Sequence, residues 1–426
     1  MSRCGLVLLI APALLAAETH ILTLRQAVHR AAEQNPEVLI ARFNEQIAAQ
    51  NVRIVRAPFN PRVIVGSGLA YTSGFPMSIE GSAPSIIQAQ ALQSLYNRPL
   101  TFQVAAAREN ARGATVDTAN ARDEAAYRVA VLFLDAERLT HEADLAEKQV
   151  EALEKAAVVI EARVKEERDL EIENKRAALS VAQGRQRATS LRSEQNAVES
   201  ELAILLSFPP DDLVRPAQEE REWPTLVLSE AEAIDQALTA NNDLRKLEVS
   251  MRAKALEVQS AKSSRYPQID LVAQYGLFAK YNNWEDYFRS FQRNNGELGI
   301  SIAFPLLPGR ASGGETAKAE LEAAKLRTQF NATRDRVAVN ARESYAEVQK
   351  AKTARDVARL ELDVAREQLS ILLAQMQEGR VTLRQVEEAR SIEMAKWMGI
   401  YEAEAGIEKA QLQLLRLTGG ILAALQ

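Results

Sequence analysis

The sequence predicts a mainly α-helical protein with a small β part, built as two structural repeats. Three observations lead to this fold class: few helix breakers, long stretches with heptad spacing, and an internal repeat. The 426 residues include only 18 glycines and 14 prolines, and aromatic residues make up 5% of the chain. Hydrophobic residues make up 47% and charged residues 26%, a composition that excludes a disordered chain.

The first 17 residues have the pattern of a signal peptide. Arg3 supplies a positive charge, and residues 6–16 form an apolar run that is shorter than the ~20 residues of a membrane-spanning helix. Ala16 and Ala17 each offer a small residue that suits cleavage. We expect export and removal of residues 1–17, the alternative being a retained anchor. Cys4, the only cysteine, would leave with it, so no cysteine chemistry is expected.

Residues 18–208 and 228–426 are expected to be two copies of one repeat. The segment that begins at Leu24 (LRQAVHRA) recurs at Glu230 (EAEAIDQA), an offset of 206 residues. After the expected strands the offset is 211, so the extra residues lie in one loop, where insertions are tolerated. Residues 209–227, which include four prolines, are the expected linker.

Each repeat is expected to contain a helix, two strands and two long helices, in that order. Repeat 1 should have helices over about 23–57, 99–165 and 170–207, with strands over about 62–72 and 85–96. Repeat 2 should have helices over about 229–264, 312–378 and 381–418, with strands over about 268–279 and 296–305. Thr23 is suited to cap the first helix, and Ser229 forms a capping-box pattern with Glu232.

The expected strands alternate large apolar residues with small or polar ones. In the last strand the large residues are Leu298, Ile300, Ile302 and Phe304, and those between them are Gly299, Ser301 and Ala303. This alternation is typical of membrane-barrel strands, whose apolar side chains face lipid and whose polar ones face the lumen. It fits a soluble hairpin with one buried face equally well, so the strands alone leave both possibilities open.

The long helices are expected to pack as coiled coils. Residues 100–207 and 315–417 contain no proline, and apolar residues follow a 4–3 spacing over residues 139–164 and 358–376. This period indicates packed, supercoiled helices. A helix over residues 99–165 would be ~100 Å long at about 1.5 Å per residue, so it has to project from a compact domain.

Four strands in one chain are too few to close a membrane barrel, and an open sheet edge cannot lie in hydrocarbon. If the strands are in a membrane, several chains must share one barrel. Two chains would supply roughly eight strands around a filled interior, whereas three would supply about twelve strands around an aqueous lumen. We prefer three chains, with the helices forming a tube around the same axis.

Several motifs resemble those of the TolC-like outer-membrane factor family, the outer membrane efflux proteins. They are Leu22-Thr23-Leu24, Asn35-Pro36, Arg265-Tyr266-Pro267-Gln268-Ile269, the segment Leu298 to Leu306 (LGISIAFPL) and Glu378-Gly379-Arg380-Val381-Thr382-Leu383. The resemblance covers nearly the whole chain after residue 17. It depends on the order of these elements, found twice, because no single motif is decisive.

The resemblance implies a homotrimer, with a twelve-stranded β-barrel in the outer membrane of a Gram-negative-type envelope and an α-helical barrel in the periplasm. Such a protein is the exit duct of a tripartite efflux pump or a type I secretion system. A periplasmic adaptor (membrane fusion) protein would contact the helix tips, and an inner-membrane transporter would supply the energy. The duct would open at its periplasmic end. Neither catalysis nor a cofactor is implied.

The resemblance also assigns the helix tips that an adaptor would contact. In repeat 2 they are Gly379, Arg380, Val381 and Thr382, and the glycine would mark the turn between two helices. In repeat 1 they are Arg168, Asp169 and Leu170, with Arg168 at the family's glycine position. This departure leaves open whether the turn or the adaptor contact differs, or whether the segment is an ordinary charged surface.

In the family, acidic residues after the second tip narrow the periplasmic entrance. Gln385 and Glu388 occupy those positions, so one carboxylate is kept and one is replaced by an amide. Three Glu388 carboxylates around a threefold axis would attract cations, the alternative being a plain surface carboxylate. The arginine and acid that latch the family's entrance align with Val381 and Asn174, so closure must rely on other contacts.

An aromatic cluster lies in the longer loop of repeat 2. Its members are Trp284, Tyr287, Phe288 and Phe291. Such residues are expected at a membrane interface or at the outer mouth, or else in a locally packed loop.

Other functional classes find little support in the sequence. The formal net charge of −5 argues against a nucleic-acid partner, which requires a basic stripe. Residues 309–316 superficially match a phosphate loop, but Glu315 occupies the position that requires lysine. The three histidines lack metal-ligand spacing, and no nucleophile–base pattern is present. The main rival from another class is a soluble periplasmic coiled-coil scaffold.

Overall fold

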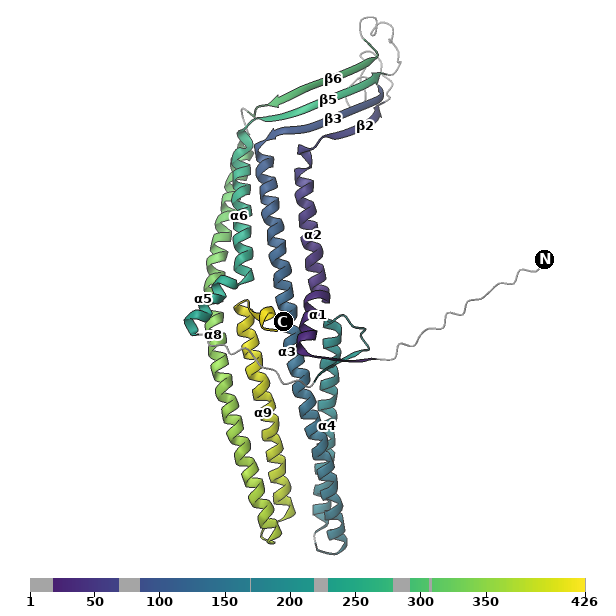
Figure 1. The fold of residues 1–426 in the computed structure, drawn as a ribbon, viewed down its shortest axis with the longest axis vertical. Helices are drawn as coiled ribbons and strands as arrows, with labels where there is room; N and C mark the ends of the chain where they lie inside the picture. The colour runs from purple at the N-terminus through teal and green to yellow at the C-terminus, as the bar shows by residue number, and fades with distance from the viewer. Residues whose placement is uncertain are drawn as a thin grey trace, which may run out of the picture. The chain divides into compact units, whose positions relative to one another are not determined.

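The computed structural model describes residues 18–68, 85–168, 170–217, 229–278, 292–305 and 309–425. These residues are mostly helical with a small sheet part, as the sequence predicts (Figure 1). The expected signal peptide and the aromatic cluster of Trp284, Tyr287, Phe288 and Phe291 lie outside the described residues. Both stay predictions.

The chain divides into two compact units that cut across the sequence repeats. Unit 1 comprises Met1–Ile40, Asn120–Asn241 and Arg336–Gln426, and unit 2 comprises Ala41–Ala119 and Asn242–Asp335. Each unit therefore takes segments from both halves of the sequence.

Unit 2 contains a four-stranded antiparallel sheet. Its strands are β2 (Arg62–Gly68), β3 (Ser85–Asn97), β5 (Gln268–Phe278) and β6 (Asn294–Ala303), in the order β2-β3-β5-β6. The central pair, β3 and β5, joins the two halves of the sequence, with Ala91 opposite Ala273. Strands β2 and β6 are the two edges, and each pairs with one neighbour among the described residues.

One face of this sheet is apolar and open. The strand register aligns Val63, Val65, Ala89, Ala91, Leu271, Ala273, Tyr275, Leu298 and Ile300 on that face. Val65, Leu298 and Ile300 are 67%, 76% and 62% exposed. The other face carries polar residues, among them Gln88, Gln90, Asp270, Gln274, Glu297 and Ser301. The alternation predicted from the sequence is therefore confirmed across four strands.

The helical part of unit 2 comes from α2 (Pro36–Arg56), α3 (Arg98–Lys165), α6 (Asn242–Lys262) and α8 (Gly309–Gln377). Short 3₁₀ turns, η1 (Ala57–Phe59) and η2 (Ser263–Arg265), lead into β2 and β5. Ion pairs join neighbouring helices, as Lys246 and Asp117 do at 2.7 Å. Within the described residues, no helix combines the length and apolar character needed to cross a membrane.

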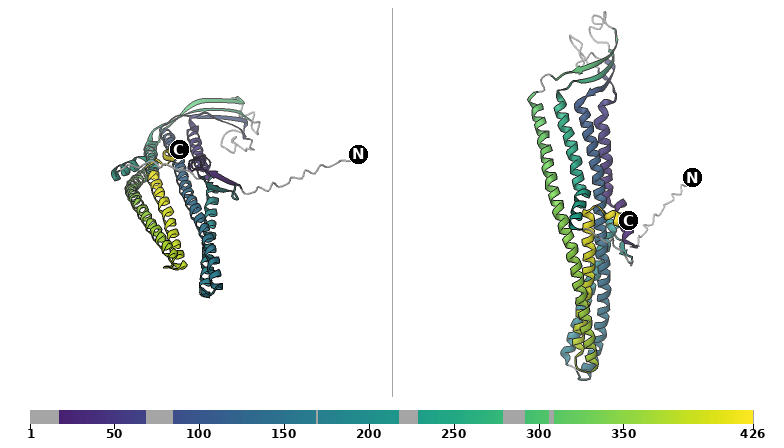
Figure 2. Two further views of the ribbon diagram at one scale, coloured as in Figure 1. Left: turned by 60° about the horizontal axis from the view of Figure 1, so that its bottom comes forward. Right: turned by 60° about the vertical axis from the view of Figure 1, so that its left-hand side comes forward.

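Unit 1 is a helical bundle with one small parallel sheet. It contains α1 (Leu24–Gln34), α4 (Glu171–Leu205), α5 (Glu230–Ala240), α9 (Leu383–Leu417) and α10 (Ile421–Leu425), the remaining parts of α3 and α8, and the strands β1 (Thr19–Leu22) and β4 (Leu213–Pro216). Helices α8 and α9 run side by side (Figure 2). The main core contains Phe133 of α3, Val28 of α1 and Leu202 of α4, all fully buried.

Some predicted local features are present. The heptad prediction is confirmed at Leu139, Ala143 and Ala146, which are 3%, 0% and 1% exposed. The capping box of α5 is also present, because the Ser229 N–H donates to Glu232 Oε2 at 2.8 Å and the Glu232 N–H donates to Ser229 Oγ at 3.3 Å.

Other local features differ from the expectation. Asn35 interrupts the helix expected over 23–57, because its backbone leaves the helical conformation (φ −57°, ψ 134°). Its Oδ1 accepts the Glu37 N–H at 2.9 Å, and its Nδ2 donates to the Leu205 carbonyl at 2.9 Å. Asn241 interrupts the corresponding helix of repeat 2. The expected linker contains β4, which pairs in parallel with β1.

Candidate functional site: the helix tips

The two helix tips are the turns that join α3 to α4 and α8 to α9. Both belong to unit 1 and lie at the same end of it (Figure 1). Contacts join the two hairpins near this end: Gln149 Nε2 of α3 donates to Ser391 Oγ of α9 at 3.2 Å. Ala146 packs against Met394 and Met398 in a small buried cluster. The two hairpins are therefore in contact within unit 1, and their tips lie at the same end of it (Figure 1).

The second tip is a Schellman turn. The Gly379 N–H donates to the Met376 carbonyl at 3.0 Å, and the Arg380 N–H donates to the Gln375 carbonyl at 2.9 Å. Gly379 has φ +72°, in the left-handed region that favours glycine. The glycine predicted to mark this turn therefore does so.

Thr382 begins α9 with a capping box. Its N–H donates to Gln385 Oε1 at 2.9 Å, and the Gln385 N–H donates to Thr382 Oγ1 at 3.5 Å. Val381 is half-buried beside it. Arg380 pairs with Glu378 at 3.1 Å, and both side chains are exposed. The second tip thus offers a charged, well-ordered turn.

The first tip has the same hydrogen-bonding pattern without a glycine. The N–H groups of Glu167 and Arg168 donate to the carbonyls of Val164 and Arg163, both at 2.9 Å. Glu167 has φ 57°, so it adopts the left-handed conformation. The sequence alignment that gave Arg168 the glycine position is therefore wrong by one residue, because Arg168 corresponds to Arg380.

The residue that begins α4 differs from Thr382. Leu170 makes no capping hydrogen bond with its side chain, which cannot accept one, and it is 73% exposed. Asp169, the third residue assigned to this tip, lies outside the described residues. The first tip therefore has the same turn as the second, but it lacks both the glycine at the left-handed position and the capping threonine.

The three residues assigned to the entrance have different surroundings. Asn174 is half-buried on α4. Gln385 is engaged in the capping box of α9. Glu388 has a 60% exposed side chain and pairs with Arg384 of the same helix at 3.1 Å. A lumen-facing ring of Glu388 stays a prediction.

A groove of about 580 Å³ lies beside these residues within unit 1. Its lining includes Gln149 of α3, Arg176 and Arg187 of α4, and Arg384, Glu387 and Glu388 of α9. The charges are mixed, so the groove suits a polar partner surface rather than an apolar ligand.

Glu387 is one of the lining residues that sequence reasoning missed. Its side chain is only 16% exposed and pairs with Arg390 at 3.1 Å. Burial raises the pKa of the Glu387 carboxyl, and the charge of Arg390 opposes this rise. Its neighbours in the heptad pattern could have indicated it, because Val386 and Ala389 are buried.

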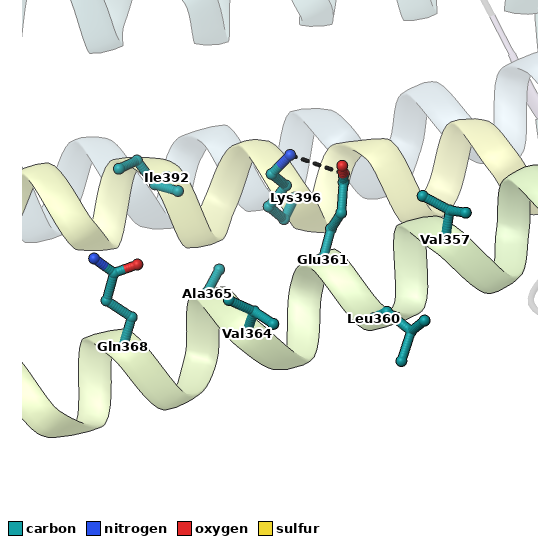
Figure 3. Close-up of a pocket in the computed structure, with 8 residues that line it drawn as sticks. All are labelled: Val357, Leu360, Glu361, Val364, Ala365, Gln368, Ile392 and Lys396. Carbon is teal, nitrogen blue, oxygen red and sulfur yellow. Dashed lines mark hydrogen bonds and ion pairs between the residues drawn. The ribbon is translucent and has the colours of Figure 1, made fainter.

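A second groove, of about 370 Å³, lies between α8 and α9 in unit 1. Val357, Leu360 and Val364 of α8 and Ile392 of α9 line it, and the ion pair of Lys396 with Glu361 at 2.8 Å crosses it (Figure 3). Leu360 and Val364 are 66% and 65% exposed. The face of the α8–α9 hairpin that carries these residues is therefore apolar and open.

The histidines lie apart. His20 contacts Asp212 at 2.9 Å, His29 lies 3.8 Å from Glu33, and His141 stacks on Tyr401. Within the part of the chain that the structure describes, no group of three or more His, Cys, Asp or Glu residues could hold a metal ion.

Comparison with known proteins identifies the architecture. Residues 233–420 match the sequence profile of the outer membrane efflux protein family. Among solved structures, the chain is similar to a membrane protein from Pseudomonas aeruginosa (TM-score 0.77, 15% identity, 93% of this chain and 90% of that chain). It is also similar to the CmeC outer membrane channel of Campylobacter jejuni (TM-score 0.77, 11% identity, 93% and 85%). A third is the outer membrane protein VceC of Vibrio cholerae (TM-score 0.75, 17% identity, 93% and 96%).

A comparison with curated protein sequences gave no match. The solved structures share the fold at low identity, and the sequence profile covers most of the second repeat. The second half of the chain therefore matches the outer membrane efflux protein family, and the chain as a whole shares the fold of solved outer membrane channels.

Proposed function

We propose that the protein is the outer-membrane exit duct of a tripartite efflux pump, a passive channel assembled from three identical chains. A periplasmic adaptor would open it at the helix tips, and an inner-membrane transporter would deliver the substrate. The match to an efflux family favours a pump over a type I secretion system. The single observation that carries the proposal is the open apolar face of the four-stranded sheet.

This sheet is complete only in an assembly. In hydrocarbon, each unpaired backbone N–H or C=O costs several kcal/mol, so neither β2 nor β6 could remain an edge there. Pairing β6 of one copy with β2 of the next removes both edges at once. Three copies would give about twelve strands, enough for an aqueous lumen. The polar face with Gln88, Gln90 and Gln274 would then line that lumen.

Exposed apolar side chains on the helices support the same assembly. Phe43, Ile47 and Ile54 follow one side of α2 and are 59%, 65% and 68% exposed. Leu360 and Val364 do the same on α8. Stripes of this kind mark contact surfaces, and a second copy of the chain is the partner that the sheet already requires.

A soluble periplasmic scaffold is the alternative. It would need another protein surface to cover Leu298 and Ile300, which are 76% and 62% exposed. A membrane covers such residues without a further partner, and this favours the channel.

The proposal is tested on the full chain purified from membranes in detergent. Light scattering should give the mass of three chains, and addition to a planar lipid bilayer should give stepwise ionic currents. A soluble monomer that carries no current would exclude the duct and leave the scaffold.

A further inference from the structure

The backbone nitrogen of Glu18 faces a carboxylate that is largely withdrawn from solvent. The Glu18 N–H donates to Asp212 Oδ1 at 3.0 Å, and the Glu18 carbonyl accepts the Leu213 N–H at 3.0 Å. The other oxygen of Asp212 lies 2.9 Å from His20 Nε2. The Asp212 side chain is only 10% exposed. One carboxylate therefore binds both the backbone N–H of Glu18, which precedes strand β1, and the His20 side chain within β1.

The surroundings of Asp212 are fixed from two sides. Strand β4 is held by Arg215, which pairs with the fully buried Glu199 of α4 at 3.2 Å. The His20 and Phe208 rings stack with their centroids 4.1 Å apart, and the Arg30 guanidinium lies 3.8 Å from the centroid of the Phe208 ring. These contacts position Asp212 and His20 independently of the charge on the Glu18 nitrogen.

We propose that Asp212 is the receptor for a new N-terminus at Glu18. Hydrolysis of the Ala17–Glu18 peptide bond by a leader peptidase would add the hydroxyl of water to the Ala17 carbonyl carbon and its hydrogen to the Glu18 nitrogen. The released leader then ends in a carboxylate, and the new N-terminus at Glu18 is an α-ammonium at neutral pH. This inference rests on the export that the proposed function requires.

The cleavage changes the character of one hydrogen bond. Before it, the Glu18 nitrogen is a neutral amide; afterwards it is a cation 3.0 Å from Asp212 Oδ1. Charge-assisted hydrogen bonds are about twice as strong as neutral ones. The carboxylate is already favoured there, because the Glu18 N–H and then His20 lower the pKa of Asp212. Pairing should in turn raise the pKa of the α-amino group above its ordinary value of about 8.

The first experiment is the intact mass of the mature protein purified from membranes. The expected mass is that of a chain that begins at Glu18. A mature chain with any other first residue overturns the proposal.

The second experiment measures how fast an aldehyde selective for N-termini labels the folded protein as the pH is varied. The paired ammonium should label slowly at neutral pH, and Asp212→Asn should label roughly tenfold faster, which corresponds to about one unit of pKa. Asp211→Asn is the matched control, because Asp211 is the exposed neighbour. Equal rates in the wild type and Asp212→Asn would overturn the proposal.

A variant with one additional alanine before Glu18 shows whether slow labelling comes from the ion pair with Asp212 or only from burial of the N-terminal segment. It keeps the Glu18 amide as a donor to Asp212 but moves the ammonium away, so it should label as fast as Asp212→Asn. Labelling as slow as in the wild type would reject the pairing. Bilayer currents of the same samples distinguish failure of the channel proposal from failure of the Asp212 proposal. If the wild type conducts normally but its N-terminus labels fast, only the role of Asp212 is rejected.

Discussion

Two residues at the helix tips share a left-handed backbone, although only one of them is a glycine. Gly379 has φ +72° and Glu167 has φ 57°. A residue with a Cβ atom pays roughly 1–2 kcal/mol for this conformation, whereas glycine does not. The first tip therefore keeps a local strain that the second tip lacks.

Substitutions at these two positions should change the free energy of unfolding in opposite directions. Glu167→Gly should stabilise the protein by about 1 kcal/mol, and Gly379→Ala should destabilise it by about 1 kcal/mol. A Cβ atom at Gly379 would meet no other atom within 4 Å, so the loss would come from the backbone alone. The midpoint of thermal unfolding, followed by helical circular dichroism in detergent, measures both effects.

Gly399→Ala is the matched control for Gly379→Ala. Gly399 lies inside α9, and a Cβ atom there also meets nothing within 4 Å. Alanine should stabilise that helix, because it has the higher helix propensity. Unfolding midpoints that move the same way in both variants would contradict the backbone explanation.

The buried carboxyl of Glu387 should make stability depend on pH. Burial raises the pKa of Glu387 in the folded state, so its contribution is fully present below the ordinary value of 4.5 and is lost as the pH rises through the folded-state pKa. Glu387→Gln should therefore unfold at a higher temperature than the wild type near pH 7, and the difference should shrink near pH 4.

Glu388→Gln serves as the control for this pH dependence. Its side chain is 60% exposed, against 16% for Glu387, so burial contributes little there. If Glu388→Gln shows the same pH-dependent gain, or Glu387→Gln shows none, the effect of burial on Glu387 is rejected.

At the scale of single elements, the start of α4 lacks the cap that begins α9. Leu170 is the N-cap residue and Glu173 occupies the third helical position. Leu170→Thr would complete a capping box with Glu173, which should stabilise the protein by about 1 kcal/mol. Leu170→Ala is the control, since it removes the exposed leucine without adding an acceptor. Equal unfolding temperatures of the two variants would exclude capping as the cause.

The elements differ in how far the sequence could predict them. The strands and long helices follow from periodicity, because apolar contacts such as Ala143 in α3 recur at a fixed spacing. The interruption at Asn35 depends on a bond to the distant Leu205 carbonyl, which no local pattern encodes. Strand β4 is only four residues long, and its pairing with β1 spans nearly the whole first repeat.

The helix tips show the same limit. Gly379 could be assigned because glycine suits a left-handed turn, whereas Glu167 adopts that turn against its preference. The groove that contains Glu387 needs three helices to meet, so its lining was not predictable from one helix.

At the scale of the whole molecule, the two faces of the sheet should respond differently to charge. Ile300 lies on the apolar face and Ser301 on the polar face of the same strand. Ile300→Lys should cost about 2–4 kcal/mol if that side chain lies near the bilayer midplane, and should abolish stable trimers in detergent extracts. Ser301→Lys should preserve the trimer and change only the conductance.

The comparison of these two variants is decisive for the orientation of the sheet. Loss of the trimer with Ser301→Lys and its survival with Ile300→Lys would reverse the assignment of the two faces. Mass by light scattering and single-channel current measure the two outcomes.

The pairing of β3 with β5 has a consequence for the seam between chains. It joins the second strand of one repeat to the first strand of the next, and the same relation would hold between β6 and β2 of a neighbouring copy. Shifting the pair Gln93–Leu271 by the repeat offsets gives Phe304 opposite Val65. Oxidation of a Val65→Cys, Phe304→Cys variant should therefore link chains covalently, and denaturing gels would detect the product.

Val65→Cys with Ala303→Cys is the control, because neighbouring residues of a strand point to opposite faces. Linking of the control but not of the first pair would mean a different register. In a trimer with the expected register, the strands at the seam between two chains would pair as β3 and β5 do within one chain, and the assembly would approach sixfold rotational symmetry. A substrate would then pass a barrel wall made of six nearly equivalent β-hairpins, contributed in turn by the first and the second repeat of each chain.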